Sequence, residues 1–164
     1  MATELKDKNG NVITRDGSPI YQAVISGAVV KGNVDMDKRL MWITGTTEAR
    51  DRDGDVVTMN GWDLKNYLKN PVFMWAHDYG SLPIGGARKV VRRYNPKRLD
   101  FLMHFADLRD LWTFPEVVMR MYRDGKLSAS SVGFIPRKFE PLEKQDDDEE
   151  GAIWRPGRKF LKQE

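Results

Sequence analysis

The chain has 164 residues with a formal net charge of +3, and 40% of them are hydrophobic and 31% charged. These values indicate one domain with a sizeable core and exclude a wholly disordered chain, and the absence of cysteine excludes disulfides, zinc–thiolate sites and a cysteine nucleophile. Only two histidines are present and the basic residues are scattered, so we expect no metal, cofactor or nucleic-acid partner. No segment resembles a membrane span or a secretion signal, so we expect a soluble protein without a membrane partner.

The N-terminal segment is polar and carries turn signals. Asn9-Gly10-Asn11 and Asp16-Gly17-Ser18-Pro19 are typical of turns. We therefore expect a flexible arm or a loose hairpin over residues 1–22, followed by a folded domain over residues 23–164.

Short segments rich in β-branched and aromatic residues come next, separated by Gly, Pro, Asn or Asp. They predict strands over 22–31, 39–48, 71–76, 86–94, 98–107 and 127–135. Between residues 99 and 106, Leu99, Phe101, Met103 and Phe105 occupy every second position. This period of two predicts a strand with one buried face.

Two segments have the pattern of helices. Residues 63–69 carry apolar side chains at helical spacing, and Asn70-Pro71 would end that helix. Thr113 followed by Glu116 predicts a capping box for a second helix, and Gly125 stands where such a helix would end. We expect this second helix to bury the following residues: Val117, Val118, Met121 and Tyr122.

Strands dominate, with two or three helices between them. This balance predicts a mainly β protein of the α+β class, with an antiparallel barrel or sandwich surrounded by a few helices. Residues 141–151 are acidic and predict a solvated loop, after which residues 152–154 and 158–161 could each form a strand.

Asp51-Arg52-Asp53-Gly54-Asp55 superficially resembles a calcium-binding loop. The EF-hand spacing requires a glycine after the third acidic ligand and a glutamate six residues beyond it, and neither is present. The segment instead predicts a tight acidic turn between two strands.

The candidates for chemistry are one histidine and a group of serines. His77 follows the apolar segment 72–76, where a rigid strand end meets solvent, as a general base requires. His104 lies within a predicted strand and is interpreted as structural. Ser128, Ser130 and Ser131 lie in one predicted strand, and with no cysteine a nucleophile would have to be Ser, Thr or Lys. One histidine and one serine cluster fit acyl transfer, although the serines could also belong to an ordinary edge strand.

An ordered set of short motifs over about residues 40–140 carries a resemblance to a known family. The motifs are Asp51-x-x-Gly54-Asp55, Asn70-Pro71-Val72, Trp75-x-His77-Asp78, Pro83-Ile84-Gly85, a strand with Leu99, the segment 114–125 and Ser131-Val132-Gly133-Phe134. In this order they resemble the tailed-phage prohead maturation proteases of the HK97 type, which are related to the herpesvirus assemblins.

The resemblance implies a serine endopeptidase with an assemblin-like β-barrel surrounded by helices. It implies that Ser131 is the nucleophile and His77 the general base, since Ser130 and Ser128 do not match the motif. The implied substrates are scaffold and major capsid proteins, cleaved inside the assembling prohead in the host cytoplasm, and homo-oligomers would be compatible with this role. Because neighbouring strand residues point to opposite faces, we expect Ser131 to face His77 and Ser130 to point away, with His104 outside the site.

The third catalytic residue is not assigned. In the family, a strand carrying an acidic residue follows the acidic loop, whereas this sequence ends at Glu164, so we expect the natural chain to continue. Asp51, Asp53, Asp55 and Glu164 stay open as candidates, while Asp78 is disfavoured because it adjoins His77. Two other readings also stay open: an inert head-assembly or scaffold component of the same fold, and a β-barrel binding module.

Overall fold

The computed structural model describes residues 3–4, 6, 9–12, 14–15, 18–19, 21–25, 34–51, 54–142 and 157–164. Within these residues the protein is mainly β, as the sequence predicts, but it has one α-helix where two or three helices are expected. The largest sheet has the order β5-β6-β10-β9-β8. Its strands are β5 (Val34–Asp35), β6 (Leu40–Thr47), β10 (Lys97–Phe105), β9 (Gly85–Tyr94) and β8 (Val72–Phe73), all paired antiparallel.

Two three-stranded sheets and a small hairpin complete the fold. The first sheet has the order β1-β4-β11, from β1 (Thr3–Glu4), β4 (Tyr21–Ile25) and β11 (Ser130–Phe134). The second has the order β12-β13-β7, from β12 (Pro136–Pro141), β13 (Arg158–Gln163) and β7 (Val56–Val57). The hairpin joins β2 (Thr14–Arg15) and β3 (Ser18–Pro19). Strand β4 spans the boundary that we expected between residues 22 and 23.

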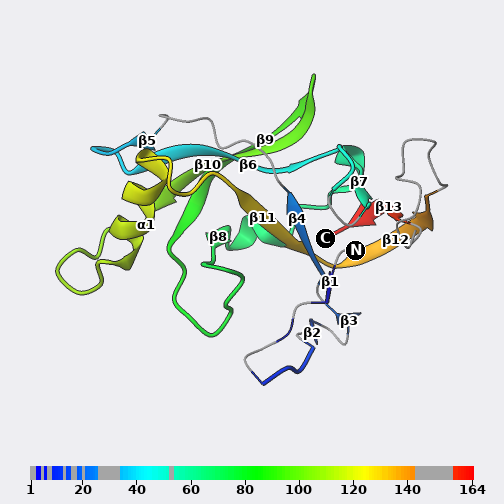
Figure 1. The fold of residues 1–164 in the computed structure, drawn as a ribbon, viewed down its shortest axis with the longest axis horizontal. Helices are drawn as coiled ribbons and strands as arrows, with labels where there is room; N and C mark the ends of the chain where they lie inside the picture. Colours follow the sequence, from blue (N-terminus) through cyan, green and yellow to red (C-terminus); the bar gives the residue numbers. More distant parts are fainter. Residues whose placement is uncertain are drawn as a thin grey trace, which may run out of the picture.

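Helix α1 (Phe114–Arg123) lies at one end of the five-stranded sheet, and the β12-β13-β7 sheet lies at the other (Figure 1). The pairings between the described strands do not close them into a barrel. The barrel of the expected architecture therefore stays a prediction. No helix in the described part of the chain has the length and apolar character needed to cross a membrane.

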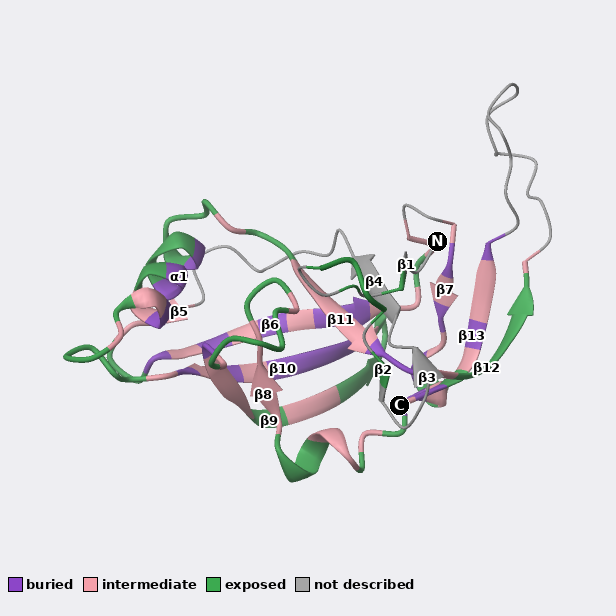
Figure 2. Cartoon of the chain, turned by 90° about the horizontal axis from the view of Figure 1, so that it is seen from below, coloured by how far each residue is buried: buried purple, intermediate pink, exposed green. Residues whose placement is uncertain are grey.

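The core lies along β6 and β10, whose buried positions are visible in Figure 2. In β10, Leu99, Phe101, Met103 and Phe105 are each at most 5% exposed, so the predicted alternation is confirmed. Helix α1 covers one end of this core with Val118, Met119 and Tyr122.

Two features of α1 differ from the prediction. Thr113 is at the N-cap but has helical dihedral angles and makes no side-chain capping hydrogen bond, so the capping box is not formed. Glu116 instead pairs with Arg39 and Arg120. The buried face is also shifted: Val117 and Met121 are exposed, while Pro115 and Met119 are buried. The expected glycine end is confirmed, since Gly125 has φ of 69°.

The helix predicted over residues 63–69 is reduced to a 3-10 turn, η2 (Tyr67–Lys69). The reason lies in tertiary pairing, because the Asp63 N–H donates to the Gln163 carbonyl at 2.8 Å and Trp62 bridges the same residue. These bonds draw the start of the segment towards β13 and leave too few residues for a longer helix. A second 3-10 turn, η1 (Met59–Gly61), precedes it.

The acidic turn between β6 and β7 is present, although residues 52–53 lie outside the described part. Gly54 donates to the Asp51 carbonyl at 3.1 Å, and the buried Asp55 side chain accepts the Arg158 N–H at 2.6 Å. No group of acidic or histidine residues suited to a metal occurs among the described residues. Of the predicted C-terminal features, 158–161 is part of β13, whereas 143–156 lies outside the described residues.

Candidate active site

Strand β11 fixes the direction of the serine side chains. The Ser130 hydroxyl donates to the Thr44 carbonyl of β6 at 2.6 Å, so Ser130 points towards the five-stranded sheet. Because side chains alternate along a strand, Ser131 points to the opposite face. Each of these two directions agrees with the prediction from the sequence.

His77 is held by a tight turn rather than by the end of a strand. Strand β8 ends at Phe73, so the prediction of a strand through residue 76 is wrong. The Asp78 N–H donates to the Trp75 carbonyl at 2.9 Å, and Ala76 and His77 have φ of 48° and 55°. Left-handed conformations cost L-residues about 1–2 kcal/mol each and are concentrated at functional sites.

The loop that carries His77 is anchored at its base and on one side. The Ile84 N–H donates to the Phe73 carbonyl at 2.9 Å, which closes the loop. The Trp75 ring meets Phe114 at the start of α1 edge to face, with centroids 5.4 Å apart. The left-handed turn is therefore supported by contacts to the helix and to the sheet.

The structure brings His77 and Ser131 together across 54 residues of chain. The distance between His77 Nε2 and Ser131 Oγ is 2.6 Å. This lies within the range that a nucleophile and its general base require. The predicted proximity is confirmed, whereas the catalytic role of the pair stays a prediction.

Burial sets the charge of the imidazole. His77 is partly buried, and loss of hydration lowers its pKa below the ordinary value of 6.5. Among the residues that the structure describes, no charged group contributes to this shift. The ring is therefore predominantly neutral at pH 7, and its Nε2 can accept the Ser131 proton.

None of the described carboxylates is hydrogen-bonded to His77. Asp78 turns back to accept the Gly80 N–H, and Asp51 accepts the Asp55 N–H. Asp55 holds Arg158, and Asp53 lies outside the described residues. The third member of a triad stays unassigned.

Glu164 lies after the acidic loop, in the part of the chain where the resemblance implies an acidic partner. It lines the same pocket as His77 and Ser131, but its carboxylate accepts hydrogen bonds from Asn66 and Arg137. Its backbone pairs with Ile135 at 2.8 and 3.0 Å. These bonds hold the Glu164 carboxylate on Asn66 and Arg137 and not on His77.

The His77–Ser131 pair lines a pocket of about 550 Å³ with a mainly apolar wall. Phe101 is part of this wall, and the rings of Tyr67 and Phe73 pack edge to face on it, with centroids 5.8 and 5.6 Å away. No Lys or Arg is among the described residues of the lining. Such a pocket suits the side chains of a polypeptide.

His104 lies outside this site, as predicted. It is on β10 opposite Leu40 and Gly86, and it is not part of the pocket lining. Burial, followed by the charges of Arg88 and Arg39, lowers its pKa. These contacts agree with a structural role.

The sequence did not predict the aromatic wall or the anchor of the His77 loop. Tyr67 lies in the segment predicted as a helix, and Trp75 lies in the segment predicted as a strand. The signal available was the clustering of aromatic residues near Asn70-Pro71, which does not reveal which rings meet.

Comparison with known proteins found no matching family, no matching curated protein and no matching solved structure.

Proposed function

We propose that the protein is a serine endopeptidase in which Ser131 is the nucleophile and His77 the general base. The observation that carries the proposal is the 2.6 Å contact between His77 Nε2 and Ser131 Oγ at a pocket large enough for polypeptide side chains. The pair comes from two distant parts of the chain, so its meeting is not a consequence of local sequence.

The chemistry proceeds by acyl transfer. Ser131 Oγ attacks the scissile carbonyl while its proton passes to His77 Nε2. The protonated imidazole then gives this proton to the leaving amine, and the C–N bond breaks to leave an acyl-enzyme. Water attacks the ester, His77 accepts a proton from the water, and the carboxylic acid product departs as the proton returns to Ser131.

Two properties of the site support this role. Burial lowers the pKa of His77, which keeps the base uncharged at neutral pH. The left-handed backbone at Ala76 and His77 is held by the packing of Trp75 on Phe114, and such strain is typical of functional turns.

The substrates follow from the resemblance to prohead maturation proteases. We propose scaffold and major capsid proteins as substrates, cleavage inside the assembling prohead, and an assemblin-like barrel as the complete architecture. Packaging with the scaffold would raise the effective concentration of substrate and restrict cleavage to assembly.

A second candidate is an inert head-assembly component of the same fold. It is favoured by one observation, namely that no described carboxylate orients His77. Co-expression with the phage scaffold and major capsid proteins separates the two candidates.

In that experiment, intact-mass spectrometry measures processing by the wild type and by single alanine variants. We expect Ser131→Ala and His77→Ala each to abolish processing, and the double variant to be no worse, because members of one catalytic unit fail together. Ser128→Ala, at an exposed position outside the pocket lining, is the control and should process normally. Unprocessed substrates with the wild type would favour the inert candidate.

A further inference from the structure

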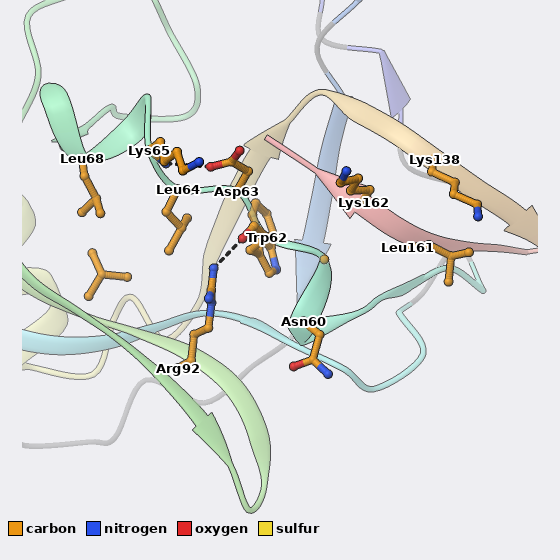
Figure 3. Close-up of a pocket in the computed structure, with 12 residues that line it drawn as sticks. Asn60, Trp62, Asp63, Leu64, Lys65, Leu68, Arg92, Lys138, Leu161 and Lys162 are labelled. Carbon is orange, nitrogen blue, oxygen red and sulfur yellow. Dashed lines mark hydrogen bonds between the residues drawn. The ribbon is translucent and has the colours of Figure 1, made fainter.

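A second pocket of about 800 Å³ lies between the five-stranded sheet and the β12-β13-β7 sheet, and we name it the cationic groove (Figure 3). Its basic side chains come from separate elements: Arg92 from β9, Lys138 from β12 and Lys162 from β13. Lys65, in the segment after η1, adds a fourth cation, and Asp63 is the one carboxylate among the described lining residues.

The lysines of the cationic groove are not neutralised within the described part of the protein. Lys65, Lys138 and Lys162 are exposed, and none of them forms an ion pair with a described carboxylate. By contrast, Lys97 and Lys159, which lie outside the groove lining, are paired with Glu48 and Glu140. The groove therefore has a local excess of positive charge that favours an anionic ligand.

The groove also has apolar walls. Leu64, Leu68 and Leu161 line it, and Leu68 is 53% exposed. A ligand that fits must bring apolar groups together with negative charge. A polypeptide segment in which acidic and apolar side chains alternate meets both requirements.

The cationic groove and the His77–Ser131 pocket share a wall. Trp62, Asp63 and Leu64 line both of them. Arg92 supports this wall from the groove side, since its guanidinium donates to the Trp62 carbonyl (Figure 3). An extended chain leaving the pocket over this wall would enter the groove directly.

We propose that the cationic groove binds an acidic, extended polypeptide segment, and that it serves as an exosite for the substrate whose scissile bond lies in the neighbouring pocket. The role as an exosite rests on the proposed protease function, whereas the binding itself does not.

The observations favour a polypeptide over a nucleic acid. Single strands are bound by exposed aromatic rings on which bases stack. Trp62 is the one aromatic residue among the described residues lining the groove, and it is only 7% exposed.

The test is fluorescence anisotropy with the Ser131→Ala protein, which prevents turnover. The probe is a labelled peptide in which Glu and Asp alternate with Leu and Ala, and its neutral counterpart carries Gln and Asn. We expect the acidic peptide to bind and its binding to weaken with salt. We expect about tenfold weaker binding after Lys138→Glu with Lys162→Glu, because two exposed attractive charge pairs are replaced by repulsive ones.

The matched control is the double variant Lys89→Glu with Lys126→Glu. These lysines are exposed, have no ion pair with a described carboxylate and lie outside the groove lining, so the change of net charge is the same. We expect this control to bind like the parent. Equal loss in both double variants, or equal binding of the neutral peptide, would overturn the proposal.

Three further outcomes are informative. Tighter binding of a labelled oligo-dT strand than of the acidic peptide would overturn the proposal in favour of a nucleic-acid groove. Groove-dependent peptide binding by a protein whose wild type processes no substrate would support the binding site while refuting the protease. Normal processing without peptide binding would refute only the groove.

Discussion

At the scale of single residues, burial of His77 determines the pH range in which it can act as a base. Its pKa lies below the ordinary value of 6.5, because the charged ring loses hydration in the pocket. We therefore expect processing activity to persist below pH 6.5 and to fall only as His77 is protonated in the folded protein. A pH profile of the cleavage rate measures this acid limb.

The lowered pKa of His77 also predicts how the free energy of unfolding depends on pH. Above pH 6.5 His77 is neutral in the folded and the unfolded chain, so its contribution is constant. As the pH falls below 6.5 the unfolded chain takes up the proton first, and the free energy of unfolding decreases until the folded pKa is passed. Urea unfolding of the wild type should show this decrease relative to His77→Gln, in which His104 still titrates. Identical pH dependence of the two proteins would contradict the burial of His77.

The pairing of His77 with Ser131 was expected only from the resemblance of the motifs to those of prohead maturation proteases, whereas strand alternation separates Ser131 from Ser130. The left-handed turn at Ala76 and His77 could not be predicted in this way. Neither residue is a glycine or asparagine, and the conformation depends on support from Phe114, which lies far along the chain.

At the scale of elements, Gly45 allows β6 to lie against the wall of the His77–Ser131 pocket. A Cβ at this position would lie 2.3 Å from Cε2 of Phe101 and 3.2 Å from Cγ1 of Val132. We expect Gly45→Ala to lower the free energy of unfolding by about 1–3 kcal/mol, as other overpacked cores do.

Chemical denaturation measures the effect, with Gly80→Ala as the control. At Gly80 a Cβ would meet only the Asp78 carboxylate, at 3.3 Å, in an exposed loop. Equal stabilities of the two variants would show that Phe101 does not occupy the space above Gly45.

The attachment of helix α1 depends on an ion pair that is largely buried. Arg39 Nη1 lies 2.5 Å from Glu116 Oε2, and Arg39 also donates to the Ala106 carbonyl at 2.7 Å. Glu116→Ala leaves the guanidinium without its counter-charge and should cost about 3 kcal/mol. Arg109→Ala breaks an exposed pair with Asp107 and should cost at most about 1 kcal/mol. Thermal or urea unfolding of both variants measures the difference, and similar losses would refute the importance of the buried pair.

Elements with a strong local pattern were predicted well, and those set by tertiary contacts were not. Strand β10 follows from the alternation of Leu99 to Phe105, which one buried face explains. The side of α1 that is buried could not be predicted, because Arg39, from another part of the chain, draws Glu116 towards it. The helix predicted over residues 63–69 is not formed for a similar reason, because the start of this segment pairs with Gln163 from the C-terminal strand.

At the scale of the whole molecule, the class of fold was predicted but the arrangement of its sheets was not. The parallel pairing of β13 with β7 joins residues about 100 positions apart, for which the sequence carries no local signal. This pairing forms the sheet that closes the cationic groove, so the groove could not be predicted from the scattered lysines.

The most direct test of the nucleophile requires no natural substrate. A fluorophosphonate reacts with an activated serine, forming a P–O bond to Oγ and releasing fluoride, while the base accepts the proton. Trypsin releases residues 127–137 as one peptide that contains Ser128, Ser130 and Ser131, and fragmentation in the mass spectrometer locates the adduct. We expect the adduct on Ser131 in the wild-type protein, with labelling abolished in His77→Ala. An adduct on Ser128 or Ser130 instead, or labelling of Ser131 at the same rate without His77, would contradict the catalytic pair.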